Sequence, residues 1–158
     1  MARLPAADLP DDLPVRNALV EITYHNPEMH RGFASLSGRV HSASRLPAKI
    51  RELVVLRVAA LNDAEFEWAS HAPAALRAGA TDGELAALRR GDLSGFQGAE
   101  RAAIEFAGAV EQRQVDDAAW AAAREHFSEG ELVDMTMLAG FYGLASRFVL
   151  ALGIGAPA

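Results

Sequence analysis

The sequence predicts an all-α fold, a bundle of several helices, and three features favour this fold class over one that contains a sheet. Hydrophobic residues make up 51% of the 158 residues, whereas aromatic residues make up 7%. Much of the apolar content is alanine and leucine, which favour helices, while strands prefer β-branched and aromatic residues. No stretch alternates apolar and polar residues in the manner of a half-buried strand. Turn residues and helix caps divide the chain into segments of helical length.

The first half of the chain predicts an arm and four helices. Residues 1–14 contain three prolines and are expected to form an extended N-terminal arm ahead of one helical domain at 15–158. The predicted helices cover 15–24, 27–42, 47–62 and 64–78. Pro27 and Pro47 suit the first turn of a helix. The helix that Pro47 opens has little polar face, so we expect it to be buried against several neighbours.

The second half predicts four more helices, and two of them carry a clear start signal. Thr81 with Glu84, and Ser128 with Glu131, have the spacing of a capping box. Asp116 or Asp117 can cap another helix. The predicted helices cover 81–90, 99–114, 116–127 and 128–150, with a loop at 91–98.

Composition excludes several classes of function. The chain has no cysteine, which removes disulfides, zinc–thiolate sites and thiol nucleophiles together. The formal net charge of −6 disfavours binding to nucleic acid or to anionic membrane surfaces. No segment has the roughly 20 uncharged apolar residues of a membrane span, and no signal-peptide pattern opens the chain. We therefore expect a cytoplasmic protein with no membrane or nucleic-acid partner.

One cluster of ionisable residues predicts chemistry. Glu67 and His71 are four residues apart on one predicted helix, so their side chains share a face and can touch. Glu52 lies near the start of the preceding helix, and an antiparallel hairpin of the two helices would bring it close to His71. A carboxylate beside an imidazole fixes the tautomer of the ring, which suits proton transfer. Glu52, Glu67 and His71 are the predicted catalytic residues.

The residues alone also allow other interpretations of this cluster. Two carboxylates and an imidazole can also ligate a divalent metal, although no second histidine stands at a metal-ligand spacing. The Glu67–His71 pair can also be an ordinary surface contact, which contributes little to stability. A third possibility is a non-catalytic helical module in which the polar pair stabilises a subunit interface. We predict no metal and no cofactor.

The two central helices are similar to the signature of the carboxymuconolactone decarboxylase and alkylhydroperoxidase D superfamily. In its peroxidase branch a glutamate is followed by Cys-x-x-Cys and then by a histidine on the next helix. On this chain the glutamate falls on Glu52 and the histidine on His71. Further matches are Leu46 and Pro47, the turn at 78–84, the start of the last helix at 128–132, and the segments 140–142 and 147–148. The resemblance covers roughly 27–152 and implies a compact helical bundle of the alkylhydroperoxidase D-like type, assembled as a trimer or hexamer.

Two positions depart from the peroxidase pattern. Ala64 and Glu67 stand where that branch has its two cysteines. Alanine is no nucleophile and a carboxylate cannot cycle through a sulfenic acid, so thiol peroxidase activity is excluded. The decarboxylase branch has no such dithiol and carries a glutamate four residues before the histidine, as here. The resemblance therefore implies a cofactor-independent lyase or isomerase that acts on a small carboxylated lactone or related carbonyl compound.

The resemblance also suggests a role for each residue. His71 would donate the proton, Glu67 would orient His71, and Glu52 would serve as a second acid or base. Arg57 and Arg147 are candidates to hold substrate carboxylates. Tyr142 is a candidate donor to a substrate oxygen, and Trp68 adds apolar bulk that excludes water.

Overall fold

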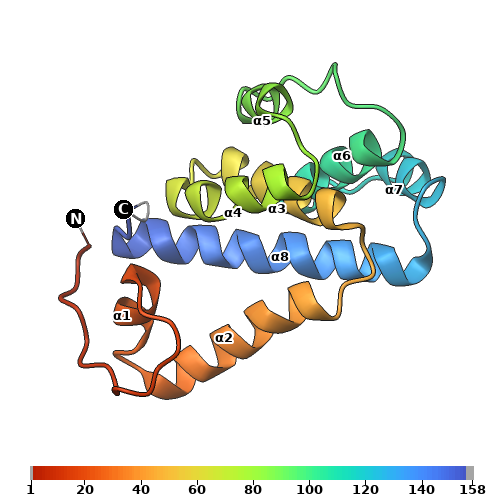
Figure 1. The fold of residues 1–158 in the computed structure, drawn as a ribbon. Helices are drawn as coiled ribbons and strands as arrows, with labels where there is room; N and C mark the ends of the chain where they lie inside the picture. The colour runs from red at the N-terminus through yellow and green to blue at the C-terminus, as the bar shows by residue number, and fades with distance from the viewer. Residues whose placement is uncertain (1, 156–158) are drawn as a thin grey trace.

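The computed structural model describes residues 2–155, and this range contains eight α-helices and no strand (Figure 1). The helices are α1 (Ala18–Thr23), α2 (Pro27–Ser42), α3 (Ala48–Leu61), α4 (Glu65–Arg77), α5 (Asp82–Arg89), α6 (Gly98–Gln112), α7 (Asp117–Arg124) and α8 (Glu129–Leu152). The prediction of an all-helical fold is confirmed.

Most helices begin where their caps predicted. Both capping boxes are formed, with Thr81 at the start of α5 and Ser128 at the start of α8. Asp116 caps α7 by accepting a hydrogen bond from a backbone N–H. The first helix is shorter than predicted because the Asn17 side chain accepts a hydrogen bond from the Val20 N–H, which places the N-cap two residues after Val15.

Helix α3 lies at the centre of the fold. It packs against α4, α5, α6 and α8, and its residues Leu53, Val54, Val55, Leu56 and Val58 are fully buried. The expected burial of this apolar helix is confirmed. In Figure 1, α8 runs along the length of the molecule, with α3 and α4 on one side and α1 and α2 on the other. The C-terminal end of α2 lies close to α8, whereas the N-terminal end of α2 lies farther from α8.

Helix α8 has 24 residues and is apolar enough to cross a membrane by length and composition. Half of the most apolar 18-residue stretch of this helix is buried inside the fold. Leu132, Met135 and Leu138 are among its fully buried side chains. A central core helix has the same properties, so the composition of α8 follows from its place in the bundle.

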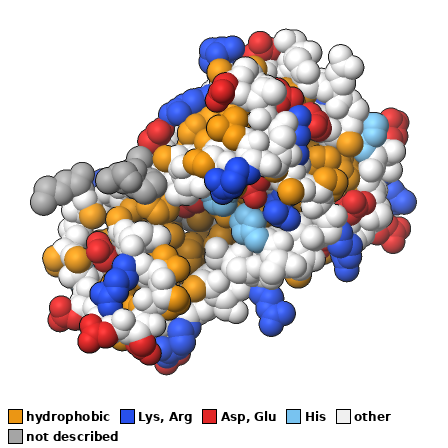
Figure 2. Space-filling view, in the orientation of Figure 1, with side chains coloured by type: hydrophobic (Ala, Val, Ile, Leu, Met, Phe, Trp, Pro, Cys, Tyr) orange, Lys and Arg blue, Asp and Glu red, His pale blue; other side chains and the backbone are white. Residues whose placement is uncertain are grey.

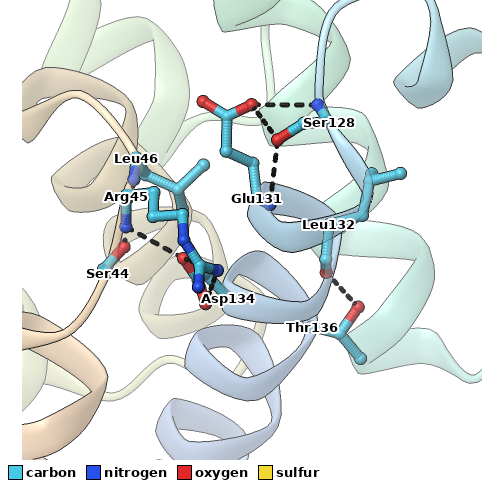
Figure 3. A network of polar contacts seen from close by, with 8 residues as sticks. All are labelled: Ser44, Arg45, Leu46, Ser128, Glu131, Leu132, Asp134 and Thr136. Carbon is cyan, nitrogen blue, oxygen red and sulfur yellow. Dashed lines mark hydrogen bonds and ion pairs between the residues drawn. The ribbon is translucent and has the colours of Figure 1, made fainter.

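The loop between α2 and α3 is tied to the first turns of α8 (Figure 3). The Arg45 backbone N–H donates to Asp134 Oδ2 at 2.9 Å, and the Arg45 guanidinium lies 3.4 Å from the same carboxylate. Ser44 Oγ accepts from the Leu46 N–H at 3.3 Å. These contacts tie the segment that follows α2 to the beginning of α8.

Candidate active site

Glu52 and His71 lie on the facing helices α3 and α4. His71 Nδ1 and Glu52 Oε2 are 2.9 Å apart, and the two side chains are 18% and 7% exposed. The hairpin expected from the sequence therefore forms, and it brings this carboxylate onto the imidazole. The catalytic roles of the two residues remain predictions.

Two further side chains extend this pair into a hydrogen-bonded chain. Tyr142 of α8 places its hydroxyl oxygen 2.8 Å from His71 Nε2. His41, in the last turn of α2, places Nε2 2.6 Å from the same oxygen. Four helices thus contribute one residue each to a chain that runs from His41 through Tyr142 and His71 to Glu52.

The carboxylate fixes the direction of every hydrogen bond in this chain. An ionised carboxylate only accepts, so His71 donates through Nδ1. In the neutral ring Nε2 is then the acceptor, and it receives the hydroxyl proton of Tyr142. The Tyr142 oxygen accepts in turn from the Nε2–H of His41. All four groups are satisfied in one consistent set of tautomers.

Electrostatics support this assignment. Burial alone would raise the pKa of Glu52, but the hydrogen bond and charge of His71, with His41 and Arg51, hold that pKa below its usual value. Burial and the neighbouring His71 lower the pKa of His41. Burial and the charges of Glu67 and Glu52 raise the pKa of Tyr142. At neutral pH the chain therefore holds an ionised Glu52, a neutral His41 and a protonated Tyr142.

The hydrogen-bonded chain of side chains nearly closes into a ring. His41 Nδ1 lies 3.9 Å from Glu52 Oε1, the second oxygen of the carboxylate that holds His71. The two imidazole rings are stacked, with centroids 5.5 Å apart and planes inclined by 9°. Arg51 Nε lies 3.6 Å from Glu52 Oε1 and supplies the nearest positive charge. His41 is the most exposed of the linked side chains, at 26%, so the chain has one end near solvent.

Glu67 lies beside this chain without joining it. Its side chain is buried, with the residue 4% exposed, and Oε1 has no hydrogen-bond partner. The sequence suggested that Glu67 orients His71, but the structure gives that contact to Glu52. The reason is geometric: neighbours four apart on one helix can touch, yet Nδ1 of His71 points across to α3. Burial raises the pKa of Glu67, and the charge of His71 offsets part of that rise.

Two predicted substrate-binding residues, Arg57 and Trp68, are not part of the hydrogen-bonded chain. Arg57 of α3 packs against Gly108 of α6, where the missing side chain leaves room for the guanidinium. Trp68 packs under the guanidinium of Arg89, 4.9 Å from the ring centroid, on α4 and α5. Their roles toward a substrate remain predictions.

An apolar groove of about 760 Å³ lies between α1, α2 and α8. Phe33 of α2 packs against Phe141 and Phe148 of α8 in its wall, with ring centroids 5.1 and 6.0 Å apart. Figure 2 shows a hollow with orange walls and a pale blue histidine surface at its edge. Arg147, another predicted substrate-binding residue, lines the groove and pairs with Glu111 of α6 at 2.5 Å.

The predicted catalytic residues line neither this groove nor two smaller hollows on the surface. The cluster is instead enclosed by helices, and the partly exposed rings of His41 and His71 connect it to the surface. Among the described residues no group of three or more histidines, aspartates and glutamates is arranged to hold a metal ion.

Sequence reasoning missed His41. It stands 30 residues before His71, and no spacing rule links two residues on non-consecutive helices. Its place follows from where α2 ends and how that end meets α8. Tyr142 was identified from the sequence, although as a donor to substrate rather than as a link between two histidines.

Three solved structures show how this fold compares with known proteins. An uncharacterised peroxidase-related protein from Ralstonia eutropha, described as an alkylhydroperoxidase AhpD core, has a TM-score of 0.85 at 21% identity, over 99% of this chain and 92% of its own. A protein of unknown function from Agrobacterium tumefaciens has a TM-score of 0.79 at 21% identity, over 87% and 96%. The debrominase Bmp8 has a TM-score of 0.77 at 18% identity, over 91% and 78%. At these identities the likeness shows the fold alone.

A search of curated proteins found no match. The sequence pattern of the carboxymuconolactone decarboxylase family matches residues 27–109, which are 83 of the 158 residues and run from α2 to α6. Glu52, Glu67 and His71 all fall inside this match, while Tyr142 falls outside it. With the same helical core and more than half of its length matched, the chain belongs to the carboxymuconolactone decarboxylase family.

Proposed function

We propose that this protein is a cofactor-independent lyase or isomerase that transfers a proton on a small lactone or related carbonyl compound. The observation that carries the proposal is the hydrogen-bonded chain of His41, Tyr142, His71 and Glu52. A structural ion pair needs two groups. Here two histidines, a tyrosine and a carboxylate are linked in order from a partly exposed end to a buried one.

The hydrogen-bonded chain from His41 to Glu52 allows a proton to move in either direction. When a proton binds His41 at Nδ1, the proton on Nε2 of the same ring can pass to the Tyr142 oxygen. Tyr142 then gives its own hydroxyl proton to His71 Nε2, which makes His71 an imidazolium beside Glu52. The reverse sequence returns the proton to solvent. Each link is a contact of 2.6 to 2.9 Å, so no side chain has to change its position.

Family membership supports the reaction class. The family is named after a decarboxylase, and loss of carbon dioxide from a carbonyl compound leaves a carbanion or enolate that must be protonated. The absence of cysteine removes thiol chemistry, which leaves acid–base groups as the reactive side chains of this site.

Exchange of hydrogen for deuterium tests the proposal. Carboxymuconolactone, simple lactones and cyclic ketones are incubated with the protein in D₂O, and proton NMR follows loss of substrate and exchange at the carbon next to the carbonyl. General acid–base catalysis contributes about 10²- to 10⁴-fold, so His71→Ala should lower the enzyme-dependent rate by that order. Tyr142→Phe should lower the rate too, because it removes the hydroxyl that links His41 to His71.

The matched control is His126→Ala, which removes an exposed histidine at the end of α7. It should keep the wild-type rate. Full activity of His71→Ala on a genuine substrate would contradict the proposal. If His71→Ala lowers the melting temperature and no tested carbonyl compound exchanges, the non-catalytic helical module is the correct reading.

A further inference from the structure

The apolar groove between α1, α2 and α8 has the size and the lining of a small-molecule binding site. Its volume of about 760 Å³ lies within the range of about 300 to 1,000 Å³ that ligand pockets usually have. Phe33, Phe141 and Phe148 give the groove an aromatic wall. Neither Glu52 nor His71 lines it, so a ligand bound there does not depend on the proposed proton transfer.

The half-buried ring of His30 supplies a polar anchor in this groove. Thr23 Oγ1 lies 2.8 Å from His30 Nδ1, 2.8 Å from the carbonyl oxygen of Leu19 and 3.2 Å from that of Val20. A carbonyl oxygen only accepts, so the single hydroxyl proton of Thr23 is directed to the backbone, and the Thr23 oxygen accepts from the Nδ1–H of His30. The opposite arrangement would set the hydroxyl oxygen against two carbonyl oxygens with no proton between them.

This contact makes Nε2 of His30 a hydrogen-bond acceptor. In a neutral imidazole with its proton on Nδ1, the other ring nitrogen carries the lone pair. Nε2 has no hydrogen-bond partner among residues 2–155. The ring is further held by Tyr24, with centroids 5.3 Å apart and planes inclined by 62°. The complement of this acceptor on a ligand is an O–H or N–H donor.

One arginine and one glutamate line the groove, and both already have partners. Arg147 pairs with Glu111 at 2.5 Å, and Glu28 pairs with Arg31. The two lining residues carry opposite charges, so together they give the groove no net charge that would attract an ion. A neutral ligand fits this lining.

We propose that the groove binds a neutral aromatic alcohol or phenol. Its rings lie against Phe33, Phe141 and Phe148, because aromatic rings pack well in edge-to-face and offset arrangements. Its hydroxyl donates a hydrogen bond to Nε2 of His30. The groove is thus a second binding site, separate from the cluster of Glu52, His71 and Tyr142.

Three matched naphthalene derivatives test the inference. 2-Naphthol has an O–H donor, 2-methoxynaphthalene has a methoxy group that only accepts, and 2-naphthoate carries a negative charge. Binding to the whole chain is measured in neutral buffer by ligand-observed NMR. 2-Naphthol should bind about three- to tenfold more tightly than 2-methoxynaphthalene, which is the range of one hydrogen bond. It should also bind more tightly than 2-naphthoate.

His30→Phe tests the hydrogen bond, because it keeps an aromatic ring and removes the acceptor. The variant should bind 2-naphthol about three- to tenfold more weakly than the wild type does. It should bind 2-methoxynaphthalene within about twofold of the wild type, since that probe has no proton to donate.

A pair of leucines on α8 tests the place of binding. Leu144 lines the groove and is 49% exposed, whereas Leu150 is 47% exposed and is not part of the lining. Leu144→Lys places a charge in the apolar groove and should weaken binding of both neutral probes at least about fivefold. Leu150→Lys is the matched control and should bind as the wild type does. Circular dichroism and thermal unfolding check that each variant is folded.

Four results would each overturn the inference. Full binding of 2-naphthol by His30→Phe would contradict the hydrogen bond, and tighter binding of 2-naphthoate would contradict a neutral ligand. Full binding by Leu144→Lys would place the probes elsewhere. The fourth result is that none of the three probes binds. If Leu144→Lys then also lowers the mass found by light scattering, a second copy of the chain occupies the groove.

Discussion

Two glutamates of one cluster have opposite surroundings. Glu52 is held by the Nδ1–H of His71 and lies near Arg51, so its charged form is stabilised. Glu67 is just as buried, its Oε1 has no hydrogen-bond partner, and burial raises its pKa. The same side chain therefore has opposite effects on stability at the two positions.

Substitution by glutamine should reveal this difference. Near pH 7, Glu67→Gln should raise the free energy of unfolding by roughly 1 kcal/mol, because the amide carries no charge to bury. The gain should shrink as pH falls and should vanish below 4.5, the ordinary pKa, because the wild-type carboxyl then becomes neutral in both folded and unfolded states. Urea unfolding of the variant and of the wild type at several pH values measures this difference in the free energy of unfolding.

Glu52→Gln is the matched comparison and should behave in the opposite way. It should lower the free energy of unfolding near pH 7 by about 1 to 3 kcal/mol, since a charged hydrogen bond is lost. Its folded pKa is depressed, so the Glu52 contribution is present above pH 4.5 and is lost as pH falls through the folded pKa. Equal effects of the two substitutions at pH 7 would contradict the assignment.

The sequence could identify these residues but not their partners. Spacing on α4 put Glu67 and His71 on one face, and the hairpin of α3 and α4 put Glu52 near the histidine. Which carboxylate receives the Nδ1–H depends on the rotamer of His71 and on the distance between the two helices. Neither is encoded by spacing. His41 was out of reach for a stronger reason, since its contact with Tyr142 joins residues 101 positions apart.

At the scale of elements, two of the three glycines of α8 have different surroundings. A Cβ on Gly143 would overlap the carboxylate of Glu111 and crowd Arg147, whereas a Cβ on Gly140 would meet nothing within 4 Å. The absent side chain at Gly143 lets α6 approach α8 closely enough for Glu111 to pair with Arg147.

Alanine should therefore have opposite effects at the two positions. Gly140→Ala should stabilise the protein by up to about 1 kcal/mol, the difference in helix propensity. Gly143→Ala gains the same propensity but must displace the Glu111 side chain, so it should be less stable than Gly140→Ala by about 1 to 3 kcal/mol. Thermal unfolding of both variants measures this difference. Equal melting temperatures would mean that Glu111 moves aside without cost.

Helix caps explain why the elements were predictable. A Ser or Thr three residues before a glutamate specifies a helix start locally, and both such boxes are formed. The end of α2 has no comparable signal. The segment that follows it is held by a contact between Arg45 and Asp134, which are 89 positions apart, so the direction of the His41 side chain could not be inferred from local sequence.

At the scale of the whole molecule, the fold resembles peroxidase-related proteins while the chain has no thiol. Peroxide reduction with a dithiol reductant should therefore stay at the rate of buffer alone. The assay follows consumption of hydrogen peroxide and of cumene hydroperoxide. Robust protein-dependent turnover would show a peroxide chemistry that uses no cysteine.

The surface supports the proposal that the chain forms a homo-oligomer, a trimer or hexamer. Several large apolar side chains of α2 and α8 are exposed, among them Met29 at 70%, Val133 at 60%, Met137 at 50% and Leu144 at 49%. Association would remove this apolar surface from water. Light scattering at micromolar concentration should give a multiple of the 16.8 kDa chain mass. A monomeric mass would refute the proposal.

The four-helix origin of the hydrogen-bonded chain has a consequence for how the protein folds. Helices α3 and α4 are neighbours in sequence, so the contact between Glu52 and His71 closes a short loop and can form early. The contact between His41 and Tyr142 cannot form until the last helix has docked on the second, across 101 residues of chain. A nascent or truncated chain without α8 can therefore bring Glu52 and His71 together but lacks the Tyr142 link to His41. The proton path becomes continuous when the final helix is in place, so acid–base competence arrives together with the completed fold.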